Sequence, residues 1–313
     1  MSGEPIELRM SRPGDADAIL AFIAAMGFTP RDRVTWDGLG MIAALATRGT
    51  EIVGAIPIEL RPVKIAPNLA VQWAHQTCVA VHPDLRGDGV GTRLQALLRS
   101  SLPDGTQMMG VYREDPDSPA YNWYLRNGFR KAMTIVSWTT EISETKIDSP
   151  LIPSPPPEGE TPGATREGTR VAHAWRRART DGCFVDQSQR VLHKWLDVHP
   201  YRSRYRFEVI GSDDAYAVLG IGALHSNSNR ADVLDFVADE SSAENLLDRC
   251  IVRARELGAS PLRWAMVERD PNVGLARSRG MSPGWTFDLL IHEATPGLHV
   301  DASNWRYASI DFA

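Results

Sequence analysis

The sequence predicts an α/β fold with a mixed sheet, arranged as two domains in tandem. Apolar segments of strand length alternate with amphipathic segments of helical length, and 313 residues suit two domains of ordinary size. Between the halves, residues 147–168 are rich in Pro, Ser, Glu and Gly, a composition that favours an extended linker and cannot bury a core. The predicted domains are therefore residues 1–146 and 169–313.

The first half begins with a predicted strand over residues 6–12 and a helix over 15–26, which Gly27 ends. Further strands are predicted at 41–47, 51–65, 71–81 and 107–112. The order strand, helix, strands, then strand–helix–strand–helix–strand indicates a mixed sheet with helices on both faces.

The second half repeats this order of elements. Its predicted strands are 171–175, 205–210, 216–224, 231–238, 262–267, 285–292 and a closing strand at 305–312, and its predicted helices are 188–198, 243–257 and 272–278.

Charge and composition exclude several function classes. The net charge is −5 with both signs spread along the chain, which argues against nucleic acid as the main partner. The N-terminus lacks the pattern of a signal peptide and no apolar stretch could span a bilayer, so we expect a cytoplasmic protein without a membrane partner. The three cysteines are far apart and indicate reduced thiols. No metal is expected, because the i,i+6 spacing of His193 and His199 puts them on different faces of a helix.

The most informative segment is residues 78–98, where an apolar strand enters a glycine-rich turn that opens into an amphipathic helix. Outward-facing N–H groups and the helix dipole at such a turn form a socket for a phosphate or pyrophosphate. The turn is neither a dinucleotide fingerprint, since Thr92 stands where a third glycine is needed, nor a P-loop, since no Lys follows Gly91. The pattern present is Arg86-x-x-Gly89-x-Gly91, and a turn without a ligand is the alternative interpretation.

A second pattern follows, in which Ala120, Tyr124, Gly128 and Phe129 occupy the positions of Asn-x-x-Ala-x-x-x-Tyr-x-x-x-Gly-Phe, with Asp117 in place of Asn. These two patterns, in this order, resemble the signatures of the GNAT acyltransferase superfamily over residues 5–142. The resemblance implies two tandem GNAT-like acyl-CoA N-acyltransferase domains.

The resemblance also implies a co-substrate, acetyl-CoA or a related acyl-CoA, and assigns the residues that hold it. In this family the strand before the turn splays from its neighbour, so that backbone N–H groups face the thioester. The implied binding residues are Val79, Ala80 and Val81 for the thioester and pantetheine arm, and Arg86, Gly87, Asp88, Gly89, Val90, Gly91 and Thr92 for the pyrophosphate.

Tyr124 matches the tyrosine that donates a proton to the departing thiolate, and an ordinary pKa of about 10 would suit this acid; a core tyrosine is the alternative. His75 stands where several family members carry a glutamate base, and imidazole titrates near neutrality. The rivals to His75 are an already neutral amine with water as proton acceptor, and the loop acids Glu114 and Asp115. We expect Asp117 to cap the helix that carries Tyr124.

In the second half these signatures are changed. Three carboxylates within residues 239–244 stand in place of the glycine turn; they would repel a pyrophosphate but suit a helix N-terminus. Ala276 and Met281 replace Tyr124 and Phe129, with Gly280 retained. We therefore expect a degenerate second domain without a cofactor site. An aromatic and basic cluster over residues 193–206 is interpreted mainly as packing and surface.

The sequence thus predicts an N-acetyltransferase that moves an acetyl or short acyl group to a primary amine of a small molecule in a ternary complex. The alternatives are a non-catalytic acyl-CoA-binding or interaction module, and an enzyme that acts on a protein lysine or N-terminus. The acceptor and the acyl length are left open, as is the choice between a monomer and a homodimer.

Overall fold

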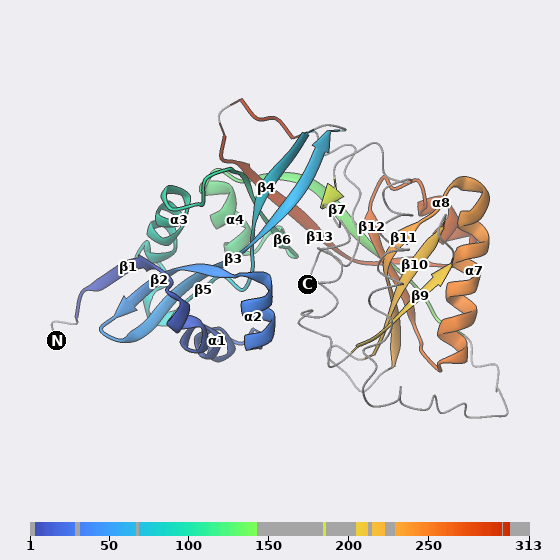
Figure 1. The fold of residues 1–313 in the computed structure, drawn as a ribbon, viewed down its shortest axis with the longest axis horizontal. Helices are drawn as coiled ribbons and strands as arrows, with labels where there is room; N and C mark the ends of the chain where they lie inside the picture. Colours follow the sequence, from blue (N-terminus) through green and yellow to red (C-terminus); the bar gives the residue numbers. More distant parts are fainter. Residues whose placement is uncertain are drawn as a thin grey trace. The chain divides into compact units, whose positions relative to one another are not determined.

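The computed structural model describes residues 4–28, 32–66, 69–142, 184–185, 205–211, 215–222, 229–295 and 297–300. Helices and strands alternate along the chain (Figure 1), so the predicted mixed α/β class is confirmed. The linker at 147–168 and the elements predicted at 171–175, 188–198 and 305–312 lie outside the described residues. None of the helices in the described ranges is long and apolar enough to cross a membrane.

The chain forms two compact units, and unit 1 comprises Met1–Ala132 together with Asp288–Asp301. Neighbouring strands in its sheet are, in order, β1 (Ile6–Met10), β2 (Ile42–Arg48), β3 (Glu51–Ala66), β4 (Leu69–Gln76), β6 (Thr106–Arg113) and the second half of β13 (Ser282–Glu293). The pair β4–β6 is parallel and the other pairs are antiparallel.

Helices cover both faces of this sheet. On one face, α1 (Ala16–Ala25) and α2 (Arg33–Leu39) bury Ile19, Phe22 and Trp36 against Leu45 and Ala55. On the other face lie α3 (Val90–Ser100) and α4 (Pro119–Arg126), whose buried residues form a second core cluster with the sheet. Short 3-10 turns, η1 (Pro13–Asp15) and η2 (Pro83–Leu85), precede α1 and α3.

Helix α2 was not predicted, although its boundaries follow from local chemistry. The Asp32 side chain accepts a hydrogen bond from the Thr35 N–H at 2.8 Å and so caps the helix, and Gly40 ends it in the left-handed conformation.

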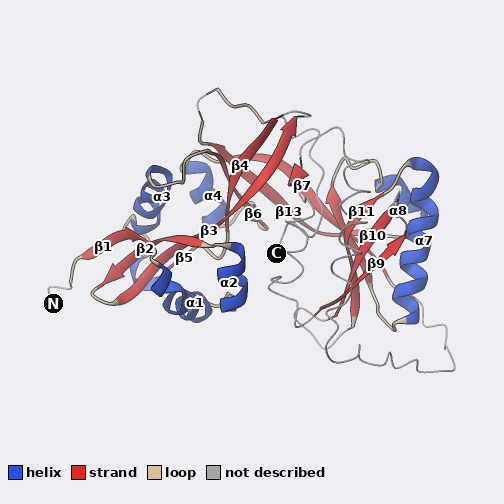
Figure 2. Cartoon of the chain, in the orientation of Figure 1, coloured by secondary structure: helices blue, strands red, loops and turns tan. Residues whose placement is uncertain are grey.

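Unit 2 comprises Met133–Phe287 and Ala302–Ala313. Its sheet contains the first half of β13, then β7 (Arg130–Thr140), β12 (Leu262–Val267), β11 (Arg230–Val237), β10 (Tyr216–Gly222) and β9 (Tyr205–Gly211). Helix α7 (Glu240–Glu256) runs along β9, β10 and β11 (Figure 2), and α8 (Val273–Ser278) precedes β13. The remaining described strands have two residues each, β5 (Ala80–Val81) and β8 (Phe184–Val185).

The last strand of each unit comes from the other half of the sequence. Strand β7 follows α4 but pairs with β12 in unit 2, whereas β13 follows α8 and pairs with β6 in unit 1 through residues 288–293. Because of this exchange, the sheet of unit 1 is completed by residues from the end of the chain. The division at a single linker does not anticipate the exchange, and the domain limits 1–146 and 169–313 stay a prediction.

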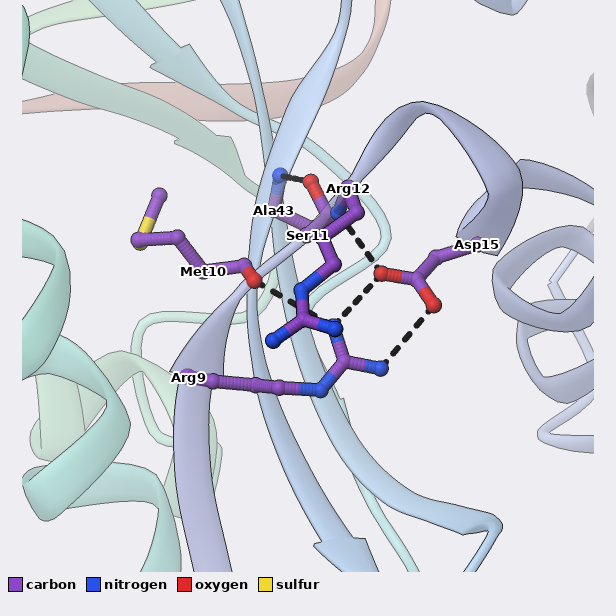
Figure 3. Close-up of polar contacts among 6 residues, drawn as sticks. All are labelled: Arg9, Met10, Ser11, Arg12, Asp15 and Ala43. Carbon is purple, nitrogen blue, oxygen red and sulfur yellow. Dashed lines mark hydrogen bonds and ion pairs between the residues drawn. The ribbon is translucent and has the colours of Figure 1, made fainter.

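Charged groups fix the corner between β1 and α1 (Figure 3). The Arg9 guanidinium donates to both carboxylate oxygens of Asp15, at 2.5 and 2.9 Å, and the Arg12 N–H donates to the same carboxylate at 2.6 Å. The hydrogen bond from Arg9 is the main cause that lowers the pKa of Asp15 to about 2.

Asp15→Asn should therefore destabilise the protein by about 1 kcal/mol at neutral pH. Because the pKa of Asp15 is lowered on folding, its contribution exists above the ordinary value of 3.8 and disappears as the pH falls toward about 2. Urea unfolding from pH 7 to pH 2 should show the wild-type and mutant curves converging at the acidic end. Asp17→Asn, whose side chain is 79% exposed, is the control and should cost less than about 0.5 kcal/mol.

Leu290 tests whether the exchanged strand completes the core of unit 1, since its side chain is fully buried among residues of α3, α4 and the sheet. We expect Leu290→Ala to lower the free energy of unfolding by about 2–5 kcal/mol. Val252→Ala on α7, where the side chain is 48% exposed, should cost less than about 0.5 kcal/mol. Equal effects of the two substitutions on urea unfolding would contradict the assignment of β13 to this core.

Candidate functional site

The predicted strand over residues 71–81 is interrupted. Strand β4 ends at Gln76, and a two-residue strand, β5 (Ala80–Val81), follows it. Three steps along β3 from Ile58 to Ala55 correspond to four steps from Gln76 to Ala80, so the break contains one extra residue, as in a β-bulge. Within the break, Cys78 adopts a positive φ of 50°, which is uncommon for a residue with a side chain.

The break separates the chain from its parallel neighbour. Pairing between β4 and β6 ends at His75 and Gly110, and β5 pairs with β3. Because the His82 N–H donates to Val53 O, amide alternation directs the Ala80 N–H toward β3 and the Val79 and Val81 N–H groups toward the diverging side. The strands therefore splay as the resemblance implies. Ala80 was expected to offer its N–H to the thioester together with Val79 and Val81, but this N–H faces β3 and points away from the opening.

The loop after β5 presents unpaired amides. Gly87 and Gly89 have φ values of 96° and 74°, and a Cβ at either position would have no atom within 4 Å. Gly89 caps α3 without a side chain, and the first amide bonded back to it is that of Arg93 at 3.0 Å. The N–H groups at the start of the helix are therefore available to an anion.

The flanking residues of this loop have defined contacts. Exposed Arg86 donates from Nε to Val81 O at 3.1 Å, which places its guanidinium beside the diverging edge. A Cβ on Gly91 would lie 3.5 Å from the Trp123 ring, and Trp123 donates from Nε1 to Thr92 Oγ1 at 3.3 Å. The start of α3 thus packs on α4.

Tyr124 lies on the buried side of α4, and its ring is 2% exposed and in edge contact with Trp123 and Phe129. Burial raises the pKa of Tyr124 well above its usual value, Cys78 adds to the shift, and Arg113 opposes it. The expectation of an ordinary pKa near 10 is therefore wrong. The phenol is therefore a persistent hydrogen-bond donor, buried in the α3–α4 core beside Trp123 and Phe129.

The residue that caps α4 is Ser118, whose Oγ accepts from the Tyr121 N–H at 3.2 Å. The expected cap, Asp117, is an exposed residue whose own N–H donates to Asp115 Oδ1. The predicted cap lies one residue too early, because Ser and Asp are both good caps. Pro119, which follows Ser118, occupies the first helical position, where proline is favoured.

His75 lies on the opposite face of the sheet from Tyr124. Alternation shows this, because Ala74 packs in the α3–α4 core and Gln76 bonds to Gln95 of α3. The imidazole of His75 is buried, with its centroid 4.9 Å from that of Trp73 and 5.4 Å from that of Tyr112. His75 also belongs to the last residue pair of β4 and β6, opposite Gly110, before these two strands diverge.

Several residues around His75 were missed by the sequence analysis. Glu59 on β3 lies opposite His75 on β4. Its carboxylate forms a buried ion pair with Arg61 at 2.6 Å. A Cβ on Gly110 would collide with the Trp73 indole, so a glycine is required where β4 and β6 separate. The signal available was a Glu and an Arg at i and i+2 in a mainly apolar strand. The rival acids Glu114 and Asp115 are exposed.

The equivalent positions in unit 2 differ in the way that the sequence indicates. The Asp239 side chain caps α7 by accepting from the Ser242 N–H at 2.9 Å, which occupies an amide that is left open at α3. The ends of α8 and α4 match, since Met281 N donates to Ala276 O as Phe129 N donates to Tyr124 O, both at 3.1 Å. Buried Ala276 thus replaces Tyr124. The expectation that the carboxylates suit a helix N-terminus is confirmed.

The described part of the chain contains no group of three His, Cys, Asp or Glu side chains able to hold a metal ion. Of the aromatic and basic cluster at 193–206, residues 193–204 and the side chains of 205 and 206 lie outside what the structure describes.

Comparison with protein families gives a match over this same region. The family model of the acetyltransferase (GNAT) domain matches residues 40–131, which include the break, the loop and α4. These residues are a GNAT domain. The match assigns this part of the chain to a family of acyl-CoA-dependent N-acyltransferase domains. No curated protein matches the chain.

Solved structures show that the likeness in fold extends beyond the GNAT domain. A probable N-acyltransferase from Enterococcus faecalis V583 is 11% identical, with a TM-score of 0.65 over 96% of this chain and 74% of that one. A GCN5-related N-acetyltransferase from Anabaena variabilis is 12% identical, with a TM-score of 0.66 over 93% and 73%. A tandem GNAT protein from the clavulanic acid biosynthesis pathway is 14% identical, with a TM-score of 0.58 over 94% and 100%. The fold of the whole chain is therefore that of tandem GNAT proteins.

A carboxylate in the loop of the GNAT domain should prevent pyrophosphate binding. At about 4 Å, repulsion between two unit charges costs about 1–4 kcal/mol, so Gly89→Glu should weaken CoA binding by about tenfold to a thousandfold. Gly105→Glu is the matched control, because Gly105 also has a positive φ, 84°, and a Cβ added there would have no atom within 4 Å. Titration calorimetry with CoA should separate the two variants, and equal affinities would place the site elsewhere.

Proposed function

We propose that unit 1 transfers an acetyl or short acyl group from acyl-CoA to a primary amine of a small molecule. The observation that carries the proposal is the continuity of three features in one short stretch of the chain. The sheet opens after His75, the outer edge of β5 leads into the amide socket of the loop, and Tyr124 is buried on the helix that packs against the start of α3.

The residues present fit acyl-CoA as co-substrate. Val79 and Val81 offer backbone N–H groups on the diverging side, where an amide-bearing pantetheine arm can pair with them as a strand would. The loop from Gly87 to Thr92 offers N–H groups and space for a pyrophosphate, and Arg86 and Arg93 add positive charge at its rim. The Asp88 N–H already donates to Leu85 O at 3.4 Å and its side chain is exposed, so Asp88 serves to connect the two glycines of the loop.

Transfer proceeds by direct attack in a ternary complex. The amine nitrogen forms a bond to the thioester carbon while the C–S bond breaks, the nitrogen loses a proton and the sulfur leaves as thiolate. Backbone N–H groups at the break stabilise the developing oxyanion. Neutral Tyr124 donates a hydrogen bond to the sulfur, and the charge of Arg113 favours the negative charge that collects there.

His75 is the proposed base. Because the strands separate at His75, an acyl group held between them can be approached from both faces of the sheet. An amine on the His75 face would meet an imidazole, while the leaving sulfur faces Tyr124 on the other. An amine that is already neutral, with water as the proton acceptor, is the competing route, and replacement of His75 by Gln would then leave the rate unchanged.

Unit 2 is proposed to have lost the cofactor site. The Asp239 carboxylate caps an N–H group at the start of α7, whereas Gly89 at the start of α3 has no side chain to do so. Ala276, which stands in the position of Tyr124, lacks a phenol. The second half of the sequence then contributes to unit 1 structurally, through residues 288–293 of β13.

The test is a thiol-release assay of the purified protein with acetyl-CoA over a library of small amines. Tyr124→Phe should keep the affinity for CoA and lower kcat by about a hundredfold or more, because the ring still fills the core and the proton donor is lost. The matched control is Tyr112→Phe, a second buried phenol that lies on the opposite face.

Tight CoA binding without thiol release for any amine would refute the catalytic proposal in favour of an acyl-CoA-binding module. Release with peptides but not with small amines would overturn the assignment of a small-molecule acceptor.

A further inference from the structure

The helix that carries Tyr124 is held by residues from the far end of the sequence. Strand β13 lies next to β6 in unit 1, and its residues Asp288, Leu290 and His292 alternate onto the face covered by α4. Each of the three has a contact on that face, so the exchanged strand does more than complete the hydrogen bonds of the sheet.

Asp288 holds the first turn of α4. The Tyr121 hydroxyl donates to Asp288 Oδ2 at 2.8 Å, and Lys131 Nζ lies 2.9 Å from Asp288 Oδ1. Both Tyr121 and Asp288 are buried, and Arg113 faces Asp288 directly across the β6–β13 pair. A buried carboxylate requires such partners, so this contact has a fixed geometry.

The end of α4 is held by the same strand. His292 Nδ1 lies 2.9 Å from Gly128 O, directly after α4, and its ring lies 5.6 Å from that of Phe129, which in turn packs on Tyr124. Leu290 joins the core cluster of Tyr121 and Tyr124 between these two points. Tyr121 and Tyr124 are one turn apart, so the position of Tyr121 determines where the Tyr124 hydroxyl points.

We propose that Asp288, supplied by the second half of the chain, is a positioning residue for acyl transfer, which fixes α4 through Tyr121 and thereby holds Tyr124 in place. The inference rests on the proposed function, because it assigns Asp288 an effect on that reaction. The residue touches neither substrate and acts through Tyr121.

Steady-state kinetics of the full chain test the inference. Tyr121→Phe keeps the ring but removes the donor, and should lower kcat by about tenfold with the KM for acetyl-CoA unchanged, since small displacements of a reacting group are costly. Asp288→Ala should do the same. Asp288→Asn still accepts from Tyr121 and should recover kcat to within about threefold of wild type, a rescue that loss of fold stability alone would not give.

Glu293→Gln is the matched control, because Glu293 lies on the same strand and forms an ion pair with Arg130. Lys131→Met removes another partner of Asp288, and the Lys131 side chain is half exposed. Both variants should keep the wild-type kcat. A normal kcat in Tyr121→Phe and Asp288→Ala, or an equal loss in Glu293→Gln, would overturn the inference.

Hydrogen exchange separates failure of this inference from failure of the proposed function. If the wild type binds CoA but releases no thiol with any amine, the proposed function is refuted. The rate of hydrogen exchange over residues 119–126 then still tests whether Asp288 and Tyr121 hold α4 in place. Tyr121→Phe should exchange faster over residues 119–126 and at the wild-type rate over residues 90–100. Glu293→Gln should exchange at the wild-type rate over both segments, and this result would support the role of Asp288 in holding α4. Unchanged exchange over 119–126 would overturn it.

Discussion

The separation of two parallel strands is the constraint on which the site depends. Parallel neighbours normally continue to pair, and here the pairing stops at His75 and Gly110 because the chain inserts one residue and turns sharply at Cys78. This local irregularity has an energetic cost, which the flanking pairs of β3 with β4 and with β5 offset. Everything proposed about the acyl group requires that opening.

Around the opening, the two faces of the sheet differ in chemistry. The α3–α4 face is mainly apolar, with the Gln76–Gln95 amide pair and the Tyr121–Asp288 hydrogen bond buried in it, and it presents a phenol whose burial keeps it protonated. The other face carries aromatic rings, an imidazole and the Glu59–Arg61 pair. An environment divided in this way suits a reaction in which one group must lose a proton and another must gain one.

Local signals could be predicted from sequence, and features that depend on distant segments could not. The glycines of the loop, the tyrosine of α4 and the capping carboxylates of α7 are determined by their immediate neighbours, so pattern alone located them. The bulge at Cys78 carries no glycine or proline to mark it. The raised pKa of Tyr124 comes from burial in the folded core, and the exchange of β7 and β13 depends on pairing between residues far apart in sequence.

Strand exchange has a consequence for biosynthesis. When the ribosome has made the first half, β6 still lacks the neighbour that residues 288–293 provide, and the nascent polypeptide presents an open strand edge. The sheet of unit 1 can be completed only after residues 288–293 have been translated, which makes its folding slow and non-local. Both halves of the chain must therefore fold together, because each unit contains a strand from the other half of the sequence.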